Sequence, residues 1–405
     1  GQTDSIDYGK GRAAGHEAEN QLPMLRTVAR AVESPRHTQD LAPAVYRVAA
    51  NILSGRPQPG AIEMPIDIQY GRTSVPVGDP LPVHPIPPQQ DALTRAAELI
   101  GNASKRIIIA GGGAVGGGAS EKVQQLAESL NAPVFTSGNG RGVIPDDHPL
   151  SAGSFVTRPN MLAAIADTDV VIAVGTRLRG PLDAWGRIPG KLVHIDVDPQ
   201  VHGLVLAPTV SIIADAAEAI SQLKEQMNAA PGDEDFLSAT KSAWQDIQAS
   251  TREAIGPDMS DIMDTMRGVM ERDSSFVRDM TMPAYAWGNQ MFPIYSPRST
   301  MNPNSGAIGP GLPMANGAAL ASGKKTVVIH GDGGVMVHIG ELSTTAQYQL
   351  PVVLVVFTDG GYGVLRGIQS QRFEGRNIGT DLATPNFAML ARSMGIEGEQ
   401  VKGLD

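Results

Sequence analysis

The chain has 405 residues, a length that exceeds what one hydrophobic core usually holds and that predicts two or three domains. Hydrophobic residues make up 41% of the chain. A net charge of −10 and an aromatic content of 4% argue against a protein that binds nucleic acid by charge or by base stacking. Cysteine is absent, which excludes disulfides and thiol catalysis and suits a cytoplasmic protein, and no apolar run reaches the roughly 20 residues of a membrane span.

The first predicted domain covers residues 1–80. Residues 44–53 place apolar side chains at the i, i+3, i+4 and i+7 positions of an amphipathic helix, and the turn sequence at 54–57 ends it. A short strand is expected to begin at Gly60. Residues 74–90 are rich in proline, which fixes φ and removes backbone donors, so they predict an extended linker.

The second predicted domain, residues 84–226, alternates short apolar runs with helical periods. The apolar runs predict strands at 106–110, 133–136, 170–174 and 192–195. Between the first two, Val123, Leu126 and Leu130 recur at helical spacing. This alternation predicts a doubly wound parallel sheet, and the polar, acidic residues 227–235 mark the next boundary.

A run of glycines, 111–118, follows the first strand of this domain, where a dinucleotide-binding turn would lie. The run contains no clean G-x-G-x-x-G with an acidic residue about 20 positions later, because Asn131 lies there. The sequence therefore favours a structural use of these glycines. Binding of FAD or an adenine nucleotide stays open but unsupported, and a nicotinamide oxidoreductase is a weak third hypothesis. His148 and His194 are expected to be turn or strand-end residues rather than ligands.

The third predicted domain covers residues 236–405. A candidate strand at 276–280 contains Asp279 as a strand-end polar group. A turn rich in glycine and proline follows at 301–313, and the small residues that begin at Ala315 predict a closely packed helix.

Residues 327–366 organise the rest of this domain. An apolar run, Val327–Ile329, ends in Gly331-Asp332-Gly333-Gly334, and about ten residues with helical spacing follow. A second apolar run, Val352–Phe357, ends in Thr358-Asp359-Gly360-Gly361. The pattern predicts a βαβ unit whose two strand ends lie side by side.

The two strand ends carry Asp332 and Asp359, and we expect both carboxylates to face one point. Mg²⁺ binds one or two protein carboxylates together with phosphate oxygens, and glycines after a strand let backbone N–H groups approach a phosphate. The sequence therefore predicts a diphosphate held through Mg²⁺. The alternative is a tight turn in which Asp332 is only solvated.

These motifs resemble those of the thiamin diphosphate enzymes, in particular the acetolactate synthase, benzoylformate decarboxylase and pyruvate decarboxylase group. The resemblance implies that Asp332, Asp359 and the main-chain carbonyl of Gly361 bind the metal. It also implies that Ile308 is the apolar residue that wedges under the cofactor and keeps it bent. The implied cofactor-binding residues are Ile308, Gly331, Asp332, Gly333, Gly334, Asp359, Gly361 and Tyr362.

The chain departs from that family at Thr358-Asp359, where the relatives usually carry Asn-Asn. An aspartate adds a negative charge beside a diphosphate, which we expect to weaken cofactor binding or to change the metal preference. Tyr362 continues this turn into a helix that includes Arg366, which is expected either to contact a substrate carboxylate or to cap the helix.

The resemblance also implies an activating glutamate on an early strand of the first domain, acting across a dimer interface. No residue matches it, so the catalytic residues stay unassigned; Glu17 and Glu63 are expected to be structural or solvated. Residues 1–80 are therefore expected to be the C-terminal part of a pyrimidine-binding domain, and residues 236–405 a C-terminally incomplete diphosphate-binding domain.

The implied function is a lyase or transferase that acts on 2-oxo acids with thiamin diphosphate and Mg²⁺. Loops at 141–150, 175–178 and 194–199 favour acetolactate synthase-like carboligation. The alternatives are a benzoylformate- or pyruvate-type decarboxylase and a catalytically weak paralogue that still binds the cofactor. The resemblance further implies a homodimer or homotetramer with shared active sites.

Overall fold

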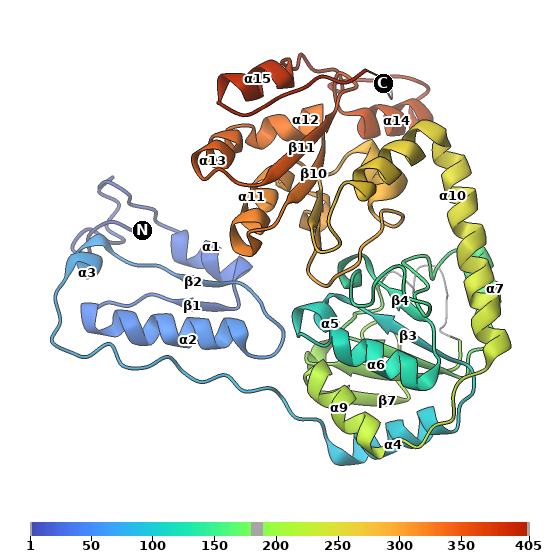
Figure 1. The fold of residues 1–405 in the computed structure, drawn as a ribbon. Coiled ribbons are helices and arrows are strands. Elements are labelled where there is room, and N and C mark those ends of the chain that lie inside the picture. Colours follow the sequence, from blue (N-terminus) through green and yellow to red (C-terminus); the bar gives the residue numbers. More distant parts are fainter. Residues whose placement is uncertain (1, 180–188, 403–405) are drawn as a thin grey trace.

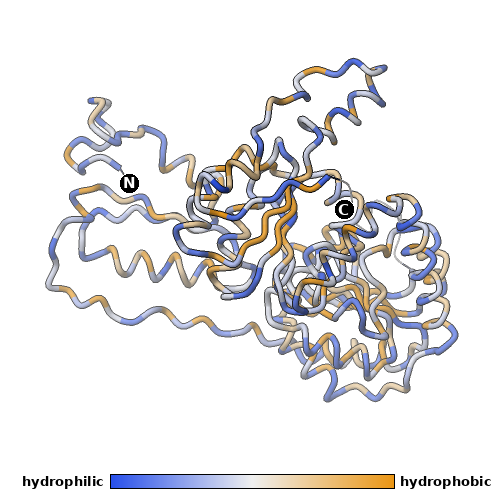
Figure 2. Tube along the Cα trace, turned by 45° about the horizontal axis from the view of Figure 1, so that its top comes forward, coloured by the Kyte–Doolittle hydropathy of each residue, from blue (hydrophilic) through white to orange (hydrophobic). Residues whose placement is uncertain are grey.

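The structure is a computed structural model that describes residues 2–179 and 189–402. Three α/β units follow one another along the chain (Figure 1). Every paired strand in their three sheets is parallel, and Figure 2 shows the most hydrophobic stretches of the trace running through the interior. The expected α/β architecture with parallel sheets is confirmed. The predicted end of the third domain, Asp405, lies outside the described residues.

The first unit is small and has a two-stranded sheet. Its elements are α1 (Gln21–Val28), β1 (Ala31–Glu33), η1 (Thr38–Asp40), α2 (Leu41–Leu53), β2 (Gly60–Ile62) and α3 (Ile66–Tyr70). The predicted helix is α2, which begins three residues before 44, and the predicted strand is β2. Residues 71–89 form no helix or strand and are mostly exposed, as an extended linker should be (Figure 1).

The second unit contains a five-stranded sheet in the order β4-β3-β5-β6-β7. Its elements are α4 (Gln90–Gly101), β3 (Arg106–Ala110), α5 (Gly112–Gly116), α6 (Ser120–Leu130), β4 (Val134–Thr136), η2 (Gly138–Gly140), α7 (Pro159–Ala164), β5 (Val170–Val174), β6 (Lys191–Asp196), η3 (Pro199–Val201), β7 (Val210–Ile213) and α9 (Ala216–Gln226). All four predicted strands are present, and β7 is an additional one.

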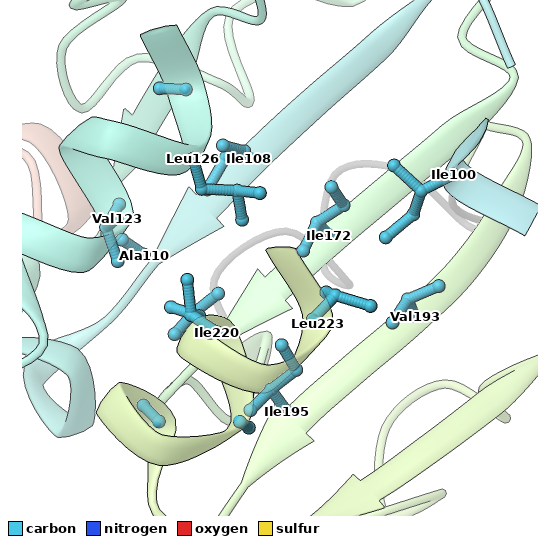
Figure 3. Close-up of a cluster of buried hydrophobic side chains, with 14 of the residues drawn as sticks. Ile100, Ile108, Ala110, Val123, Leu126, Ile172, Val193, Ile195, Ile220 and Leu223 are labelled. Atoms are coloured by element: carbon cyan, nitrogen blue, oxygen red, sulfur yellow. The ribbon is translucent and has the colours of Figure 1, made fainter. Parts of the chain in front are cut away.

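Successive residues of each strand point to opposite sides of the sheet, and both faces of the sheet are covered by helices. On one face Ile108, Ile172 and Val193 pack against side chains of α6 and α9 (Figure 3). On the other face Ile107 and Val171 pack in a cluster with residues of α7 and of the long helix α10 (Glu234–Gly268). This is the doubly wound arrangement that the sequence predicted.

Helix α10 runs between the second and third units (Figure 1). Its first turn is capped by Asp233, whose side chain accepts a hydrogen bond from the N–H of Phe236 at 2.7 Å. Gly256 has φ 81° and ψ 169° and is followed by Pro257, which lacks a backbone donor, so the helix kinks there. A positive φ of this kind is readily adopted only by glycine.

The third unit has a four-stranded sheet in the order β11-β10-β8-β9. Its elements are β8 (Ser275–Arg278), η4 (Ala284–Gly288), β9 (Thr300–Met301), η5 (Asn304–Gly306), α11 (Gly311–Ser322), β10 (Thr326–Gly331), α12 (Asp332–Val335), η6 (Met336–His338), α13 (Glu341–Gln347), β11 (Val352–Phe357), α14 (Gly363–Arg372) and α15 (Phe387–Ser393). The single helix expected after Gly334 is wrong, because α12, η6 and α13 divide that segment. Gly340, a poor helix former, lies just before α13.

A buried ion pair of the second unit is hydrogen-bonded to the backbone of the third unit. Arg141, in the loop after β4, lies 2.8 Å from Asp146, and their side chains are 1% and 13% exposed. The guanidinium also donates to the carbonyls of Gly288, Asn289 and Phe292. One hydrophobic cluster continues from one sheet to the other, so the two units share a packed core. Within residues 2–179 and 189–402, no helix combines the length and apolar character needed to cross a membrane.

Candidate functional site

The ends of β10 and β11 meet as the sequence predicts. The pairing of Gly331 with Phe357 brings both turns to one edge of the sheet. Asp332 is completely buried, and its Oδ1 accepts the N–H of Gly333 at 2.9 Å. Its Oδ2 accepts the N–H of Gly360 at 2.9 Å. One carboxylate therefore joins the turn that follows β10 to the turn that follows β11.

Asp359 has a different environment from Asp332. Its side chain is 47% exposed, and its Oδ2 lies 3.9 Å from Nη1 of Arg366. A Cβ atom on Gly363 would lie 1.9 Å from the same oxygen, so the carboxylate lies directly over the start of α14. The two turns are in contact, while the two carboxylates have separate partners.

A cavity of about 460 Å³ opens at this edge. All predicted cofactor residues except Asp332 and Gly333 line it. The lining residues that belong to that set are Ile308, Gly331, Gly334, Asp359, Gly361 and Tyr362. The remaining wall is largely apolar and includes Met280, Met282, Tyr285, Phe357, Leu365 and Ile368.

The oxygen atoms in and beside this cavity fit a diphosphate that is held through a hard cation. Each oxygen of Asp332 accepts one hydrogen bond and keeps further acceptor capacity, and Asp359 adds carboxylate oxygens at the wall. Among the described residues no group of three or more His, Cys, Asp and Glu side chains is arranged to hold a metal. A cation here would therefore need backbone and phosphate oxygens as well, which suits Mg²⁺.

Two glycines of the turn lie where a side chain would crowd its neighbours. A Cβ on Gly333 would lie 2.8 Å from Cε1 of Tyr362, and a Cβ on Gly334 would lie 3.1 Å from Oδ1 of Asp279. Larger residues would push the turn away from its neighbours. The glycines thus let the backbone approach the cavity closely.

Asp279 supports the site, although the sequence identified it only as a strand-end group. It is completely buried. Both of its oxygens lie 3.0 Å from the N–H of Gly309, one accepts the N–H of Gly311 at 2.8 Å, and the other accepts the N–H of Met280 at 2.9 Å. The carboxylate therefore fixes the turn that presents Ile308 to the cavity.

His330 packs under the same turn. It is completely buried, and Nδ1 lies 3.8 Å from Oδ1 of Asp279. Burial lowers the pKa of His330 to about 4, more than the nearby Asp279 raises it, so the ring is neutral at pH 7. A Cβ on Gly311 would lie 2.5 Å from its Nε2, which shows how tightly the turn sits on the ring.

The glycine run of the second unit has a packing explanation. The N–H of Gly113 donates to the carbonyl of Gly175 at 2.9 Å. A Cβ on Gly111 would lie 2.3 Å from that carbonyl oxygen, and a Cβ on Gly113 would lie 2.8 Å from the Cα of Gly175. Two turns at one sheet edge approach so closely that side chains do not fit. This packing supports a structural role for the glycines rather than a role in nucleotide binding.

The other singled-out side chains have partners within the protein. His148 contacts Glu128 at 3.2 Å, and His194 contacts the carbonyl of Thr176 at 2.8 Å. Burial lowers the pKa of His194 to about 4. Glu63 is completely buried and accepts hydrogen bonds from Tyr8 at 2.7 Å and from Ser34 at 3.1 Å.

Glu17 lies in the same N-terminal segment as Glu63. Its carboxylate accepts the N–H groups of Gly11 and Ala14 at 2.8 and 3.1 Å. The contacts of Glu17 and Glu63 are those of structural residues.

Comparison with known proteins gives the following matches. Residues 93–223 match the family described as "Thiamine pyrophosphate enzyme, central domain", and residues 283–404 match "Thiamine pyrophosphate enzyme, C-terminal TPP binding domain". A probable 2-ketoarginine decarboxylase of Pseudomonas aeruginosa is 30% identical over 99% of this chain and 72% of its own length. A probable acetolactate synthase large subunit of Methanocaldococcus jannaschii is 29% identical over 89% of this chain and 65% of its own length. Glyoxylate carboligase of Escherichia coli O157:H7 is 28% identical over 93% of this chain and 66% of its own length.

Proposed function

We propose a function for this chain on the basis of its family: it belongs to the thiamine pyrophosphate (thiamin diphosphate) enzymes. Its proposed activity is that of a Mg²⁺-dependent lyase or transferase. Its substrates are 2-oxo acids, and its reaction is carboligation of the acetolactate synthase type. The observation that carries the proposal is the contact between the two turns, in which Asp332 accepts the N–H of Gly360. That contact brings the turn that carries Asp332 against the turn whose residues Asp359 and Gly361 line the cavity.

The residues at the cavity have distinct roles in this proposal. Asp332, Asp359 and the carbonyl of Gly361 hold Mg²⁺, and the glycines at 331 and 334 bring backbone close to the diphosphate. Ile308 lines the cavity and would contact the bound cofactor, and its turn is held by Asp279 through the N–H groups of Gly309 and Gly311. When bound, thiamin diphosphate supplies the electron sink for the carbanion that decarboxylation leaves. The apolar wall, which includes Phe357, Leu365 and Ile368, would exclude water from the bound substrate.

The wall also supports a particular kind of substrate. Among the described residues that line the cavity, Asp359 is the only one with a full charge. In this proposal the Asp359 carboxylate binds the metal. A guanidinium side chain would lose hydration here without gaining a carboxylate partner, which is unfavourable. A 2-oxo acid with a small or apolar side chain therefore fits better than 2-ketoarginine, despite the name of one relative.

Two alternatives have specific support. A 2-oxo acid decarboxylase without carboligation is supported by the relative named as a decarboxylase. A weakly active paralogue that still binds the cofactor is supported by the negative charge of Asp359 at the cavity wall. Shared active sites in a homodimer or homotetramer belong to the same proposal, since the glutamate would come from a neighbouring subunit.

Two measurements test the proposal. Thiamin diphosphate with Mg²⁺ should raise the melting temperature, because a ligand that binds only the native state at 100 times its Kd adds about 2.7 kcal/mol of stability. Thiamin without the diphosphate is the control and should give little shift. Incubation with pyruvate, benzoylformate and 2-ketoarginine should then yield 2-hydroxy-3-oxo acids from pyruvate. Absence of both a thermal shift and any product would refute the function, whereas aldehyde products alone would select the decarboxylase.

A further inference from the structure

Asp359 poses an electrostatic problem in the proposed function. At a wall that must receive a diphosphate, it adds a negative charge where the resemblance leads one to expect a neutral asparagine. Burying like charges close together is costly unless an opposite charge offsets them. The nearest cation that contacts Asp359 in the structure is Arg366, seven residues later on α14.

Arg366 contacts the turn at several points. Its Nη1 donates to the carbonyl of Asp359 and its Nη2 to the carbonyl of Gly360, both at 3.3 Å. Nη1 also lies 3.9 Å from the Asp359 carboxylate, and the Arg366 side chain is only 30% exposed. One guanidinium therefore holds both the backbone and the charge of the turn.

A second segment is tied to the same turn. Nη2 of Arg366 lies 2.8 Å from Oδ1 of Asp381. Beside this contact, Gly361 and Asp381 form an antiparallel bridge. The N–H of Tyr362 donates to the carbonyl of Thr380 at 2.8 Å, and the N–H of Leu382 donates to the carbonyl of Gly360 at 2.9 Å. Asp381 does not line the cavity, whereas Asp359 does.

We propose that Arg366 is a positioning residue that holds the metal-binding turn and offsets the charge of Asp359, so that an aspartate is compatible with a bound diphosphate. This inference rests on the proposed function. It assigns to Arg366 a role toward the protein's own turn rather than toward a substrate carboxylate. It also accounts for how α14 is fixed, since none of the helix's residues is buried.

The test is a double-mutant cycle on cofactor affinity. Isothermal titration calorimetry gives the Kd for thiamin diphosphate at saturating Mg²⁺, and melting of the cofactor-free proteins shows whether each variant is folded. Arg366→Met should weaken binding by about tenfold, within the range measured for contacting residues. Asp359→Asn alone should bind at least as tightly as the parent protein. The combination Asp359→Asn with Arg366→Met should recover a large part of the lost affinity, because no charge is left to offset.

Asp381→Asn supplies the matched control. It removes a carboxylate from the same guanidinium, but one that lies outside the cavity, so combined with Arg366→Met it should recover nothing. Equal affinities for Arg366→Met and the parent protein would overturn the inference. So would a D359N/R366M protein no tighter than R366M, which would leave Arg366 with a purely structural role. If the folded parent protein itself bound no thiamin diphosphate, the proposed function would fail first and the inference with it.

Discussion

Substitution of Asp279 tests whether the site depends on a carboxylate that no motif identifies. The substitution Asp279→Asn keeps the shape of the side chain and removes its charge. In the structure the two carboxylate oxygens accept the N–H groups of Met280, Gly309 and Gly311 at 2.8 to 3.0 Å. An amide has one acceptor oxygen, so its NH₂ group must face at least one of these donors.

The expected cost follows from this count. A hydrogen bond to a charged group contributes roughly 1.5–3 kcal/mol, and a buried donor left without a partner costs roughly 1–3 kcal/mol. His330 does not compensate, because burial holds its pKa at about 4 and it carries no charge at pH 7. We expect Asp279→Asn to destabilise the protein by about 3 kcal/mol. At 2–4 °C per kcal/mol this lowers the melting temperature by roughly 6–12 °C.

Differential scanning calorimetry with and without thiamin diphosphate and Mg²⁺ measures both consequences. The Asp279 variant should melt earlier, and its thermal shift with cofactor should be smaller, because Ile308 loses its fixed position. Asp273→Asn is the matched control, since Asp273 lies just before β8 in an exposed ion pair with Lys324, and such pairs contribute little. If the two variants melted together and responded equally to the cofactor, the role assigned to Asp279 would be wrong.

Three further predictions concern other parts of the molecule. Asp332→Ala should abolish the thermal shift given by thiamin diphosphate with Mg²⁺, and an undiminished shift would contradict the metal assignment. Arg141→Met should lower the free energy of unfolding in urea by about 3–5 kcal/mol, because it leaves the largely buried Asp146 without its cationic partner. A loss below about 1 kcal/mol, as for an exposed ion pair, would contradict the role of Arg141 between the second and third units. Burial holds the pKa of His194 at about 4, so between pH 6.5 and pH 4 the unfolded chain takes up a proton that the native protein does not, and stability falls by on the order of 3 kcal/mol. His194→Gln should reduce that fall in urea titrations at successive pH values, and an unchanged pH profile would contradict the assignment.

The strands that the sequence predicted well are those whose formation depends on local composition. Residues 106–110, 170–174 and 352–357 are continuous runs dominated by aliphatic residues, and the structure has strands with those bounds. The first two are fully buried, as such parallel strands usually are, whereas β11 lies at the edge of its sheet. Strands β1, β7 and β9 were not predicted. Strand β9 contains two residues and forms only through its pairing with Phe276 and Val277, which no local pattern encodes.

The site was predicted in part, for a related reason. Its glycines and the two aspartates of the βαβ unit stand within a short, patterned stretch, so their spacing identifies them. Asp279 acts on N–H groups about 30 residues further along the chain, and the contacts of His330 come from β8 and from the turn before α11. Such partners appear only when the sheet order β10-β8 is known. For Arg366 the sequence left a substrate contact and a helix cap open. In the structure Arg366 instead donates to the carbonyls of Asp359 and Gly360 in the preceding turn.

Three neighbouring strands of one sheet, β8, β10 and β11, are each followed by an aspartate at the same edge, and the resemblance assigns the metal only to the last two. The structure separates them by the hydrogen bonds they already accept. Asp279 accepts three N–H groups and has little capacity left, so it can only fix backbone. Asp332 accepts one N–H on each oxygen and keeps capacity for a cation, while Asp359 is half exposed beside a cavity and a guanidinium. Because a carboxylate binds Mg²⁺ with lone pairs that no donor has taken, the expected order of metal contact is Asp359 and Asp332 before Asp279. Charge removal at Asp332 should therefore reduce metal binding. Asparagine at position 359 keeps an amide oxygen that can still bind the metal, and charge removal at Asp279 should act through the turn and its stability.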